Sequence, residues 1–182
     1  MQTKLNKIMT KDLVILVDEK DNPLGTMEKM EAHRLAKLHR AVSVFIYNSK
    51  GDWLLQQRAK HKYHSNSLWT NTACTHPYPK EKNIDAANRR LNEEMGLTAE
   101  LTEIFDFIYI EKLDNELTEH ELDRVFIGKS DTLPKINPKE VMDYKYISYE
   151  NLKQDIEKNP ENYTVWFKKI FEKVNLFIKK NV

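Results

Sequence analysis

The chain has 182 residues, a length typical of one domain with a sizeable core, so residues 1–182 are expected to form a single domain. Its 29 lysines and arginines nearly balance its 28 aspartates and glutamates, which gives no overall attraction to nucleic acid or to an anionic membrane. The single cysteine cannot form an internal disulfide, the N-terminal segment lacks the apolar core of a signal peptide, and no run approaches the ~20 apolar residues of a membrane span. These features predict a cytoplasmic protein with neither nucleic acid nor membrane as a partner.

The first half of the chain alternates short apolar runs with turn sequences. We expect strands at 13–17, 41–47 and 53–57, a turn at 21–25, a short helix at 29–37 and a hairpin turn at 48–51. The segment 58–79 lacks clear periodicity and is rich in lysine, histidine, serine, asparagine and aromatic residues. It predicts a long irregular loop, and long loops in compact domains are commonly functional.

The second half contains the stronger helical patterns. We expect a helix at 83–95 that ends at Gly96, strands at 101–111 and 119–128 joined through 114–115, a strand at 144–147 and a helix at 150–157. Apolar residues at helical spacing, among them Phe167, Ile170 and Val174, predict an amphipathic helix at 166–179. This order is compatible with helices packed on a mixed sheet, an α/β (α+β) fold.

Histidines and glutamates recur at spacings that could bring them together. Glu119 and Glu121 are two apart on a predicted strand, so both point to one face and repel each other unless they are solvated or share a cation. His33 and His39 are six apart, so we expect them on either side of a helix-to-strand turn. Taken singly, each of these residues is more often an exposed surface group. As a set, they are the ligand types that divalent metals prefer.

The only thiol lies in Trp69-Thr70-Asn71-Thr72-Ala73-Cys74-Thr75-His76-Pro77. A lone cysteine is by itself more often a small buried hydrophobic residue than a catalytic one. Its place three positions after Thr70-Asn71 and two before His76 makes Cys74 a candidate acid or nucleophile.

Glu81 and the later run Arg89-Arg90-Leu91-Asn92-Glu93-Glu94-Met95-Gly96-Leu97 resemble the Nudix box, with Thr75 in place of its opening glycine and Arg90 in place of a glutamate. With the Cys-x-His and Glu-x-Glu elements in the same order, residues 13–166 resemble the type I isopentenyl-diphosphate isomerases, a Nudix branch. The resemblance implies a Nudix-like fold, with a mixed central sheet sandwiched between helices. The acidic group lost at Arg90 argues against pyrophosphohydrolase chemistry.

The resemblance also implies a set of site residues. It assigns one divalent ion (Mn, Zn or Mg) to His33, His39, His76, Glu119 and Glu121, and gives Glu94 a Mg ion that bridges to the substrate diphosphate. It makes Cys74 and Glu121 the acid–base pair, with Tyr109 hydrogen-bonded in the active site. It places Lys29, Arg58, Lys62, Arg89 and Arg90 on the diphosphate, and Trp69 and Trp166 beside a carbocation. His61, His64 and His120 match no ligand position and are interpreted as ordinary polar residues.

The implied activity is the reversible conversion of isopentenyl diphosphate to dimethylallyl diphosphate by protonation and deprotonation. The implied partner is a small-molecule prenyl diphosphate, and whether the chain is a monomer or a homodimer is left open. Two other functions remain: a Nudix pyrophosphohydrolase, which would not need Cys74 or the Glu119–Glu121 pair, and a metal-dependent binding module without turnover. Single residues also keep structural alternatives, such as an Arg90–Glu94 ion pair and core packing for Trp69.

Overall fold

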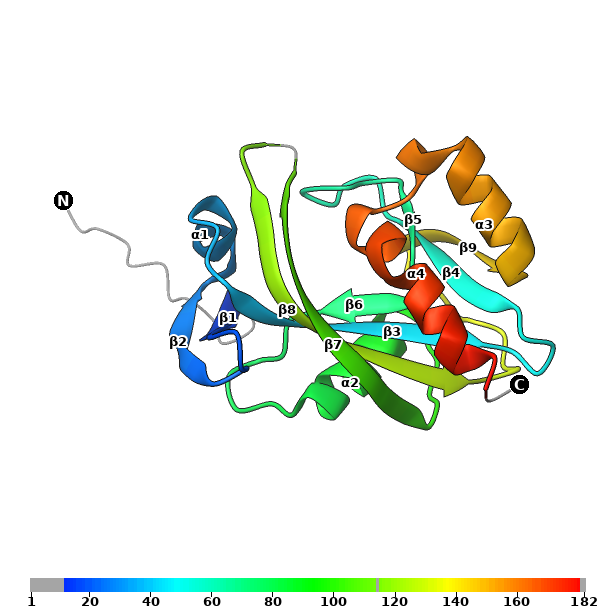
Figure 1. Cartoon of the computed structure of the whole chain (residues 1–182), viewed down its shortest axis with the longest axis horizontal. Coiled ribbons are helices and arrows are strands. Elements are labelled where there is room, and N and C mark those ends of the chain that lie inside the picture. Colours follow the sequence, from blue (N-terminus) through cyan, green and yellow to red (C-terminus); the bar gives the residue numbers. More distant parts are fainter. Residues whose placement is uncertain (1–11, 114, 181–182) are drawn as a thin grey trace.

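The computed structural model describes residues 12–113 and 115–180 (Figure 1). The predicted connection at 114–115 and the N-terminal segment therefore lie partly outside the described residues. The strands are β1 (Leu13–Val17), β2 (Pro23–Glu28), β3 (His39–Tyr47), β4 (Trp53–Arg58), β5 (Trp69–Thr70), β6 (Ala73–Thr75), β7 (Leu101–Lys112), β8 (Thr118–Lys129) and β9 (Val141–Ile147). The helices are α1 (Lys29–Arg34), α2 (Asn83–Met95), α3 (Tyr149–Lys158) and α4 (Val165–Ile178), with a 3-10 turn at Pro160–Asn162.

Strand β3 is the centre of a mixed sheet. It pairs antiparallel with β1, β4 and β6 and parallel with β8 over its full length, from His39 opposite Glu121 to Tyr47 opposite Lys129. Strands β7 and β8 form a long antiparallel hairpin, and β9 pairs antiparallel with β4. The register between β3 and β8 brings the beginning of β3 beside the glutamates near the beginning of β8.

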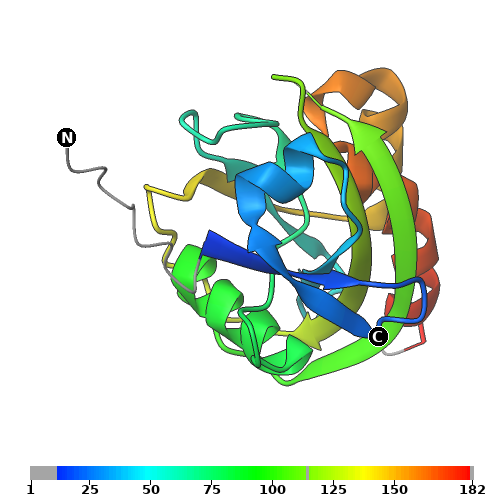
Figure 2. The same ribbon diagram turned by 90° about the vertical axis from the view of Figure 1, so that its left-hand side faces the viewer.

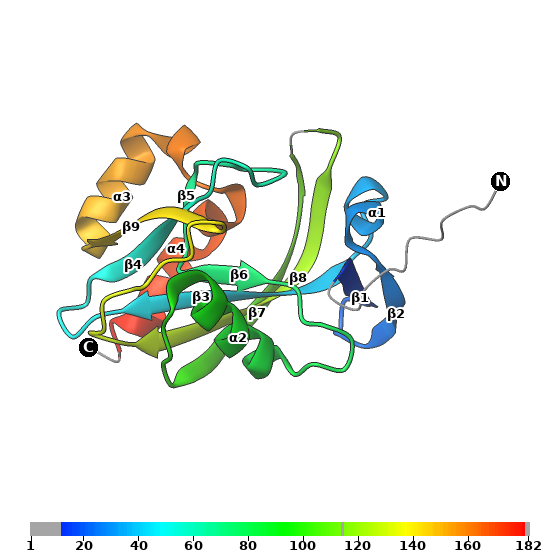
Figure 3. The same ribbon diagram turned by 180° about the vertical axis from the view of Figure 1, so that it is seen from behind.

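Both faces of the sheet are buried. Val42, Val44 and Ile46 of β3 pack with helix α2, whereas Phe45 and Tyr47 pack with α3 and α4. Figure 2 shows α2 and α4 on opposite sides of the sheet. In the reverse view of Figure 3, α2 lies on the side of the sheet that faces the viewer. Burying an aliphatic or aromatic side chain contributes about 1.5–3 kcal/mol, which explains why β3 is apolar from Ala41 to Tyr47 except at Ser43. The predicted mixed sheet between helices is confirmed.

The element predictions hold best where the pattern is local. Helix α2 has the predicted bounds, and Gly96 ends it with a left-handed φ of 62° and an N–H bonded to the Asn92 carbonyl. Strand β3 begins two residues early, α1 ends at Arg34, and the predicted turn at 21–25 already contains the start of β2. The irregular loop predicted at 58–79 is wrong at β5 and β6, because these short strands form by pairing with β4 and β3 and have no periodicity of their own.

No helix among residues 12–113 and 115–180 combines the length and the apolar character that a membrane crossing requires.

Candidate active site

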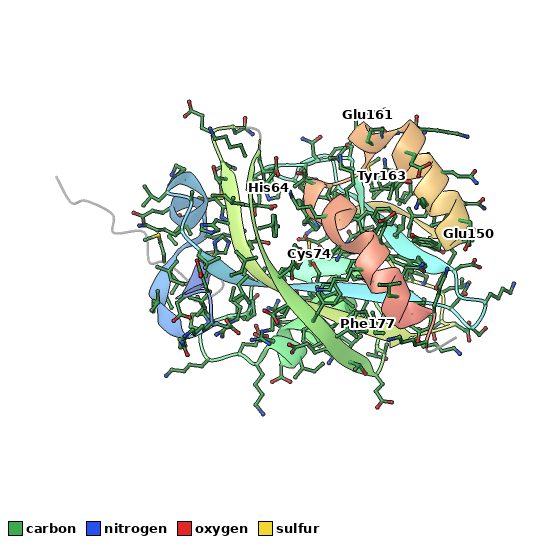
Figure 4. All side chains as sticks on the ribbon, viewed as in Figure 1. His64, Cys74, Glu150, Glu161, Tyr163 and Phe177 are labelled. Carbon is green, nitrogen blue, oxygen red and sulfur yellow. The ribbon has the colours of Figure 1, made fainter. Side chains whose placement is uncertain are left out.

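A cavity of about 370 Å³ lies beside the β7–β8 hairpin, where helix α4 and the loop after β4 approach it. Ten of the predicted site residues line this cavity: Lys29, Arg58, Lys62, Cys74, His76, Arg90, Tyr109, Glu119, Glu121 and Trp166. Figure 4 shows the labelled His64 and Cys74 between the hairpin and helix α4. Residues from α1, β4, β6, α2, β7, β8 and α4 thus meet at one place.

Three histidines converge on one glutamate at the inner end of the cavity. His33 comes from α1 and His39 begins β3, so the predicted helix-to-strand arrangement is confirmed, and both side chains are 0% exposed. The Nε2 atoms of His39 and His76 are 3.2 Å apart, and His76 Nε2 lies 2.9 Å from the Oε1 atom of Glu121. One ligand atom of each of these four residues lies within 4.8 Å of the others.

Backbone carbonyls orient two of these imidazoles. The Nδ1 atoms of His33 and His39 lie 2.7 Å from the carbonyl oxygens of Lys29 and Lys37, which assigns the Nδ1 proton and leaves each Nε2 with a lone pair. The buried Nε2 of His33 has no hydrogen-bond partner. Ligand atoms about 2.1 Å from a shared ion lie about 3.0–4.2 Å from one another, close to the spacing found here. The four residues can therefore hold a divalent cation.

The second glutamate, Glu119, belongs to a second candidate ligand group. Its Oε1 atom is 3.5 Å from the Nε2 atom of His64, and these two residues form this group with His33. His64, interpreted from the sequence as an ordinary polar residue, is only 4% exposed and lines the cavity together with Glu119. The irregular loop after β4 carries no local pattern that would have shown this. By contrast, His61 and His120 bond to the carbonyl oxygens of Lys139 and Ala36 and join neither group.

Strand β8 presents three acidic side chains on one face, and Tyr109 of β7 bridges two of them. The Tyr109 hydroxyl donates to Glu119 at 2.9 Å and to Glu121 at 2.7 Å. Burial and the neighbouring charge of Glu121 raise the pKa of Glu119 well above its usual value. Burial also acts to raise the pKa of Glu121, but hydrogen bonds to His39 and His76 hold it well below its usual value. The two carboxyls therefore have opposite preferences for a proton.

Asp123 is the third member of this face and was missed by the sequence reasoning. It is buried and accepts a 2.7 Å hydrogen bond from Ser43, while its Oδ1 atom has no partner. Burial and the charge of Glu121 raise its pKa well above the usual value. The alternation Glu119-x-Glu121-x-Asp123 along a strand was a signal that could have revealed it.

Cys74 lies on β6 opposite Ser43 of β3 and lines the cavity with Glu121. Burial raises the pKa of its thiol to about 12, so the group is protonated at neutral pH. A neutral thiol and an ionised carboxylate thus share one cavity, which is the combination that proton transfer to and from a substrate requires.

Positive charge gathers at the other edge of the cavity. Lys62 bonds to Glu140, and the guanidinium of Arg90 lies 2.6 Å from both Glu94 and Glu140. Burial lowers the pKa of Lys29, and the charges of Lys62 and Arg90 lower it further. A polyanion bound beside these three side chains would relieve the repulsion that Lys29 experiences from Lys62 and Arg90. Glu140 was also missed, because it lies in the segment before β9 with no motif around it.

Arg58 and Trp166 form the wall next to His64. The Arg58 guanidinium donates to the carbonyl oxygens of Ser65 and His64 at 3.0 and 3.2 Å, and its centre lies 5.3 Å from the Trp166 ring. The indole Nε1 of Trp166 donates to the Asn71 side chain at 3.2 Å. Arg58 therefore holds the backbone of the loop after β4 as well as facing the cavity.

Several predicted residues do not line the cavity. Arg89 donates to Glu81 at 2.7 and 2.9 Å and stacks on Tyr78 at the beginning of α2. Trp69 packs against the α4 side of the core, with the Lys145 ammonium 4.3 Å from its ring. Glu94 is buried, accepts a hydrogen bond from Gln56, and contacts the cavity-lining side chains of Arg90 at 2.6 Å and Lys62 at 3.6 Å.

Comparison with known proteins gives matches over most of the chain. The model of the NUDIX domain family matches residues 37–167. A protein of Pectobacterium atrosepticum named isopentenyl-diphosphate Delta-isomerase is 51% identical over 161 residues, which cover 88% of this chain and 90% of that protein. Isopentenyl-diphosphate Delta-isomerase 2 of Aromatoleum aromaticum is 47% identical and covers 90% of this chain and 86% of its own length.

Solved structures agree on the fold at low sequence identity. The Deinococcus radiodurans protein DR0079 matches with a TM-score of 0.71 at 19% identity, covering 92% of this chain and 98% of its own. The MutT protein of Methanosarcina mazei matches with a TM-score of 0.62 at 21% identity, covering 79% and 95%. These likenesses concern the arrangement of the sheet and helices alone.

Proposed function

The chain belongs to the Nudix domain family and, within it, to the isopentenyl-diphosphate Delta-isomerases, and from this we propose that it interconverts isopentenyl and dimethylallyl diphosphate. The observation that carries the proposal is a neutral, half-buried thiol, Cys74, and an ionised carboxylate, Glu121, on the walls of the same cavity. An unactivated alkene needs both a proton donor and a proton acceptor held in a site from which water is excluded.

The proposed reaction adds a proton at one end of a three-carbon unit and removes a proton from the other end. The Cys74 thiol gives its proton to the terminal alkene carbon, and a tertiary carbocation forms at the branched carbon. The Glu121 carboxylate removes a proton from the methylene carbon on the other side, and the double bond forms there. Return of that proton from Glu121 to Cys74 restores the starting state. The Trp166 ring faces the cavity and can stabilise the cation without acting as a base.

The His–Glu cluster would hold a divalent cation through His33, His39, His76, Glu119 and Glu121. The orphaned Nε2 of His33 and the close approach of the other ligand atoms support this assignment. Bound there, the ion supplies positive charge that keeps Glu121 ionised. Three imidazoles favour Mn, Zn or Fe over Mg. Tyr109 would keep its hydroxyl bonded to both glutamates and so hold Glu121 toward the substrate.

The cationic edge would bind the diphosphate. Lys29, Lys62 and Arg90 offer their donors there, and a Mg ion held by Glu94 would share the charge. In the described structure Lys62 and Arg90 each donate a hydrogen bond to the Glu140 carboxylate, and a bound diphosphate would replace Glu140 in these contacts. Arg89 and Trp69 were predicted to contact substrate, but their distance from the cavity lining supports a structural role in α2 and in the core.

The proposal is tested by incubating the protein with isopentenyl diphosphate and Mg in deuterated water and following the product by NMR. We expect dimethylallyl diphosphate, with deuterium entering as the substrate equilibrates. A Nudix pyrophosphohydrolase would release phosphate instead, and a binding module would leave the substrate unchanged. Either result with metal-loaded, folded protein would refute the isomerase function.

A further inference from the structure

His64 is a buried histidine for which the sequence pattern provides no role. It lies in the loop between β4 and β5, and its side chain lines the same cavity as Glu119 and Cys74 (Figure 4). Its ring centroid is 6.2 Å from that of His33, and its Nε2 atom is 3.5 Å from Glu119 Oε1. A histidine that is 4% exposed and next to a carboxylate has the position of a ligand rather than of a surface group.

Independent evidence comes from His33. The Nε2 atom of His33 is buried and has no hydrogen-bond partner, and an unpaired buried nitrogen of this kind is costly unless something binds it. One ligand atom of each of His33, His64 and Glu119 lies within 4.8 Å of the other two. His33 is also a member of the group with His39, His76 and Glu121, so the two groups meet at this residue. Ligand atoms of one octahedral site lie at most about 4.2 Å apart, so a single ion would draw the side chains of the two groups closer together.

The environment of His64 orients its ring as that of a ligand. Its Nδ1 atom lies 3.3 Å from the Ser65 hydroxyl, so its Nε2 atom is the one left facing Glu119. The Arg58 guanidinium holds the carbonyl oxygens of His64 and Ser65, which fixes the loop at this point. Outer contacts that fix the ring and its free nitrogen are typical of metal-binding histidines.

We propose that His64 is a direct ligand of the divalent ion, the fourth imidazole of one six-residue site made of His33, His39, His64, His76, Glu119 and Glu121. The inference rests on the proposed metal site and adds one ligand to it. Four neutral imidazoles, two carboxylates and one divalent cation have a total charge of zero. A buried site without net charge has a smaller desolvation penalty than a charged one. A fourth nitrogen also shifts the preference of the site toward metals that favour imidazole, such as Co, Zn and Fe, and away from Mg.

The test measures metal binding rather than turnover. Full-length protein freed of metal is titrated with Co(II) and with Mn(II) against a competing chelator, and the ions per chain are counted. In the Mn(II)-loaded protein, pulsed EPR counts the coordinated imidazole nitrogens. The variants are His64→Ala, His64→Gln and the control His61→Ala, which changes a histidine of the same loop whose Nε2 bonds to the Lys139 carbonyl.

We expect one ion per chain, four coordinated imidazoles in the wild type and three in both His64 variants. Both variants should lose Co(II) affinity by more than the about 10–100-fold typical of losing an outer hydrogen-bond partner, and His61→Ala should lose none. Glutamine can still donate a hydrogen bond to Glu119, so full affinity in His64→Gln would make His64 a positioning residue and overturn the proposal. Three imidazoles or two ions per chain in the wild type would also overturn it. A wild type that binds no ion would instead refute the underlying metal site.

Discussion

The thiol of Cys74 is held in its neutral form by burial, which raises its pKa to about 12. We predict that Cys74→Ala lowers kcat by about 10²–10⁴-fold, because a group that transfers a proton to the substrate contributes about that much. Cys74 contacts the cavity from a short strand, and alanine keeps the backbone pairing with Ser43 of β3. The unfolding midpoint in urea should therefore change little.

The pH profile gives a second measurement on the same residue. Since the thiol stays protonated up to a pH of about 12, wild-type kcat should show no inflection from thiol ionisation between pH 7 and 9. A thiol titration detected spectroscopically in that range, or turnover close to wild type in Cys74→Ala, would rule out the assignment of Cys74 as proton donor.

The number of protons released on metal binding should depend on Glu119 and the neighbouring histidines. Burial and then the charge of Glu121 raise the pKa of Glu119 well above its usual value, so in the metal-free protein this carboxyl keeps its proton to a higher pH than an ordinary glutamate does. Burial lowers the pKa of His64 to about 3 and that of His76 to about 4, so these imidazoles are already neutral. Wherever Glu119 is still protonated, binding an ion should release about one proton from it, and over that pH range affinity should rise about tenfold per pH unit.

Isothermal titration calorimetry in two buffers of different ionisation enthalpy measures the released protons. Glu119→Gln, which has no proton to lose, should reduce the number to nearly zero while binding more weakly. Release of two or more protons by the wild type would show that the histidines are protonated in the free protein, contrary to their burial.

At the scale of elements, helix α2 positions the cationic edge through its C-terminal end. Gly96 adopts a φ of 62°, and a Cβ atom there would lie 2.7 Å from the Lys135 carbonyl oxygen. The segment that follows bonds back to the helix, with the Asn137 N–H donating to Glu94 and the Lys135 N–H to Met95. That segment leads to Glu140, the partner of Lys62 and Arg90.

We predict that Gly96→Ala lowers the free energy of unfolding by at least about 1–2 kcal/mol, the cost of a left-handed backbone for a residue with a Cβ, with the clash adding to it. The control is Gly25→Ala, since Gly25 has a φ of 148° but nothing within 4 Å of an added Cβ. Urea denaturation should give a smaller loss for the control. Equal losses in the two variants would show that the close approach of Lys135 contributes nothing.

The parts of the fold and of the candidate site that could be predicted from the sequence are those that depend on local residue patterns. The bounds of α2, the shared face of Glu119 and Glu121 and the turn between His33 and His39 follow from spacing alone, and the family and fold predictions are confirmed. His64 and Glu140 could not be placed in that way. Each lies in a segment without periodicity. Glu140 is brought to the site by the pairing of β9 with β4 across more than eighty residues of chain, and the His64 backbone is held there by Arg58 at the end of β4.

The whole molecule separates its charges although its net charge is only +1. The imidazoles and carboxylates of the two candidate ligand groups cluster together, whereas Lys62 and Arg90 belong to a separate ion-pair network with Glu94 and Glu140. Composition could not show this arrangement, because a near balance of charges is equally compatible with an even surface distribution. The separation suits a substrate with an anionic head and an apolar tail, with the head at the cationic edge.

The same concentration of ligands should make the stability of the whole protein depend on metal. An ion that binds only the folded state stabilises it by about 2.7 kcal/mol at a concentration 100 times its Kd. For a chain of this size, 1 kcal/mol shifts Tm by about 2–4 °C, so adding Mn(II) or Zn(II) to chelator-treated protein should raise Tm by about 5–10 °C. Calorimetry at pH 7 measures the shift. His76→Ala should lose most of it, whereas His120→Ala, on the other face of β8, should retain it. If Tm were the same with chelator as with metal, the histidines and glutamates under the hairpin would form a polar cluster that binds no ion.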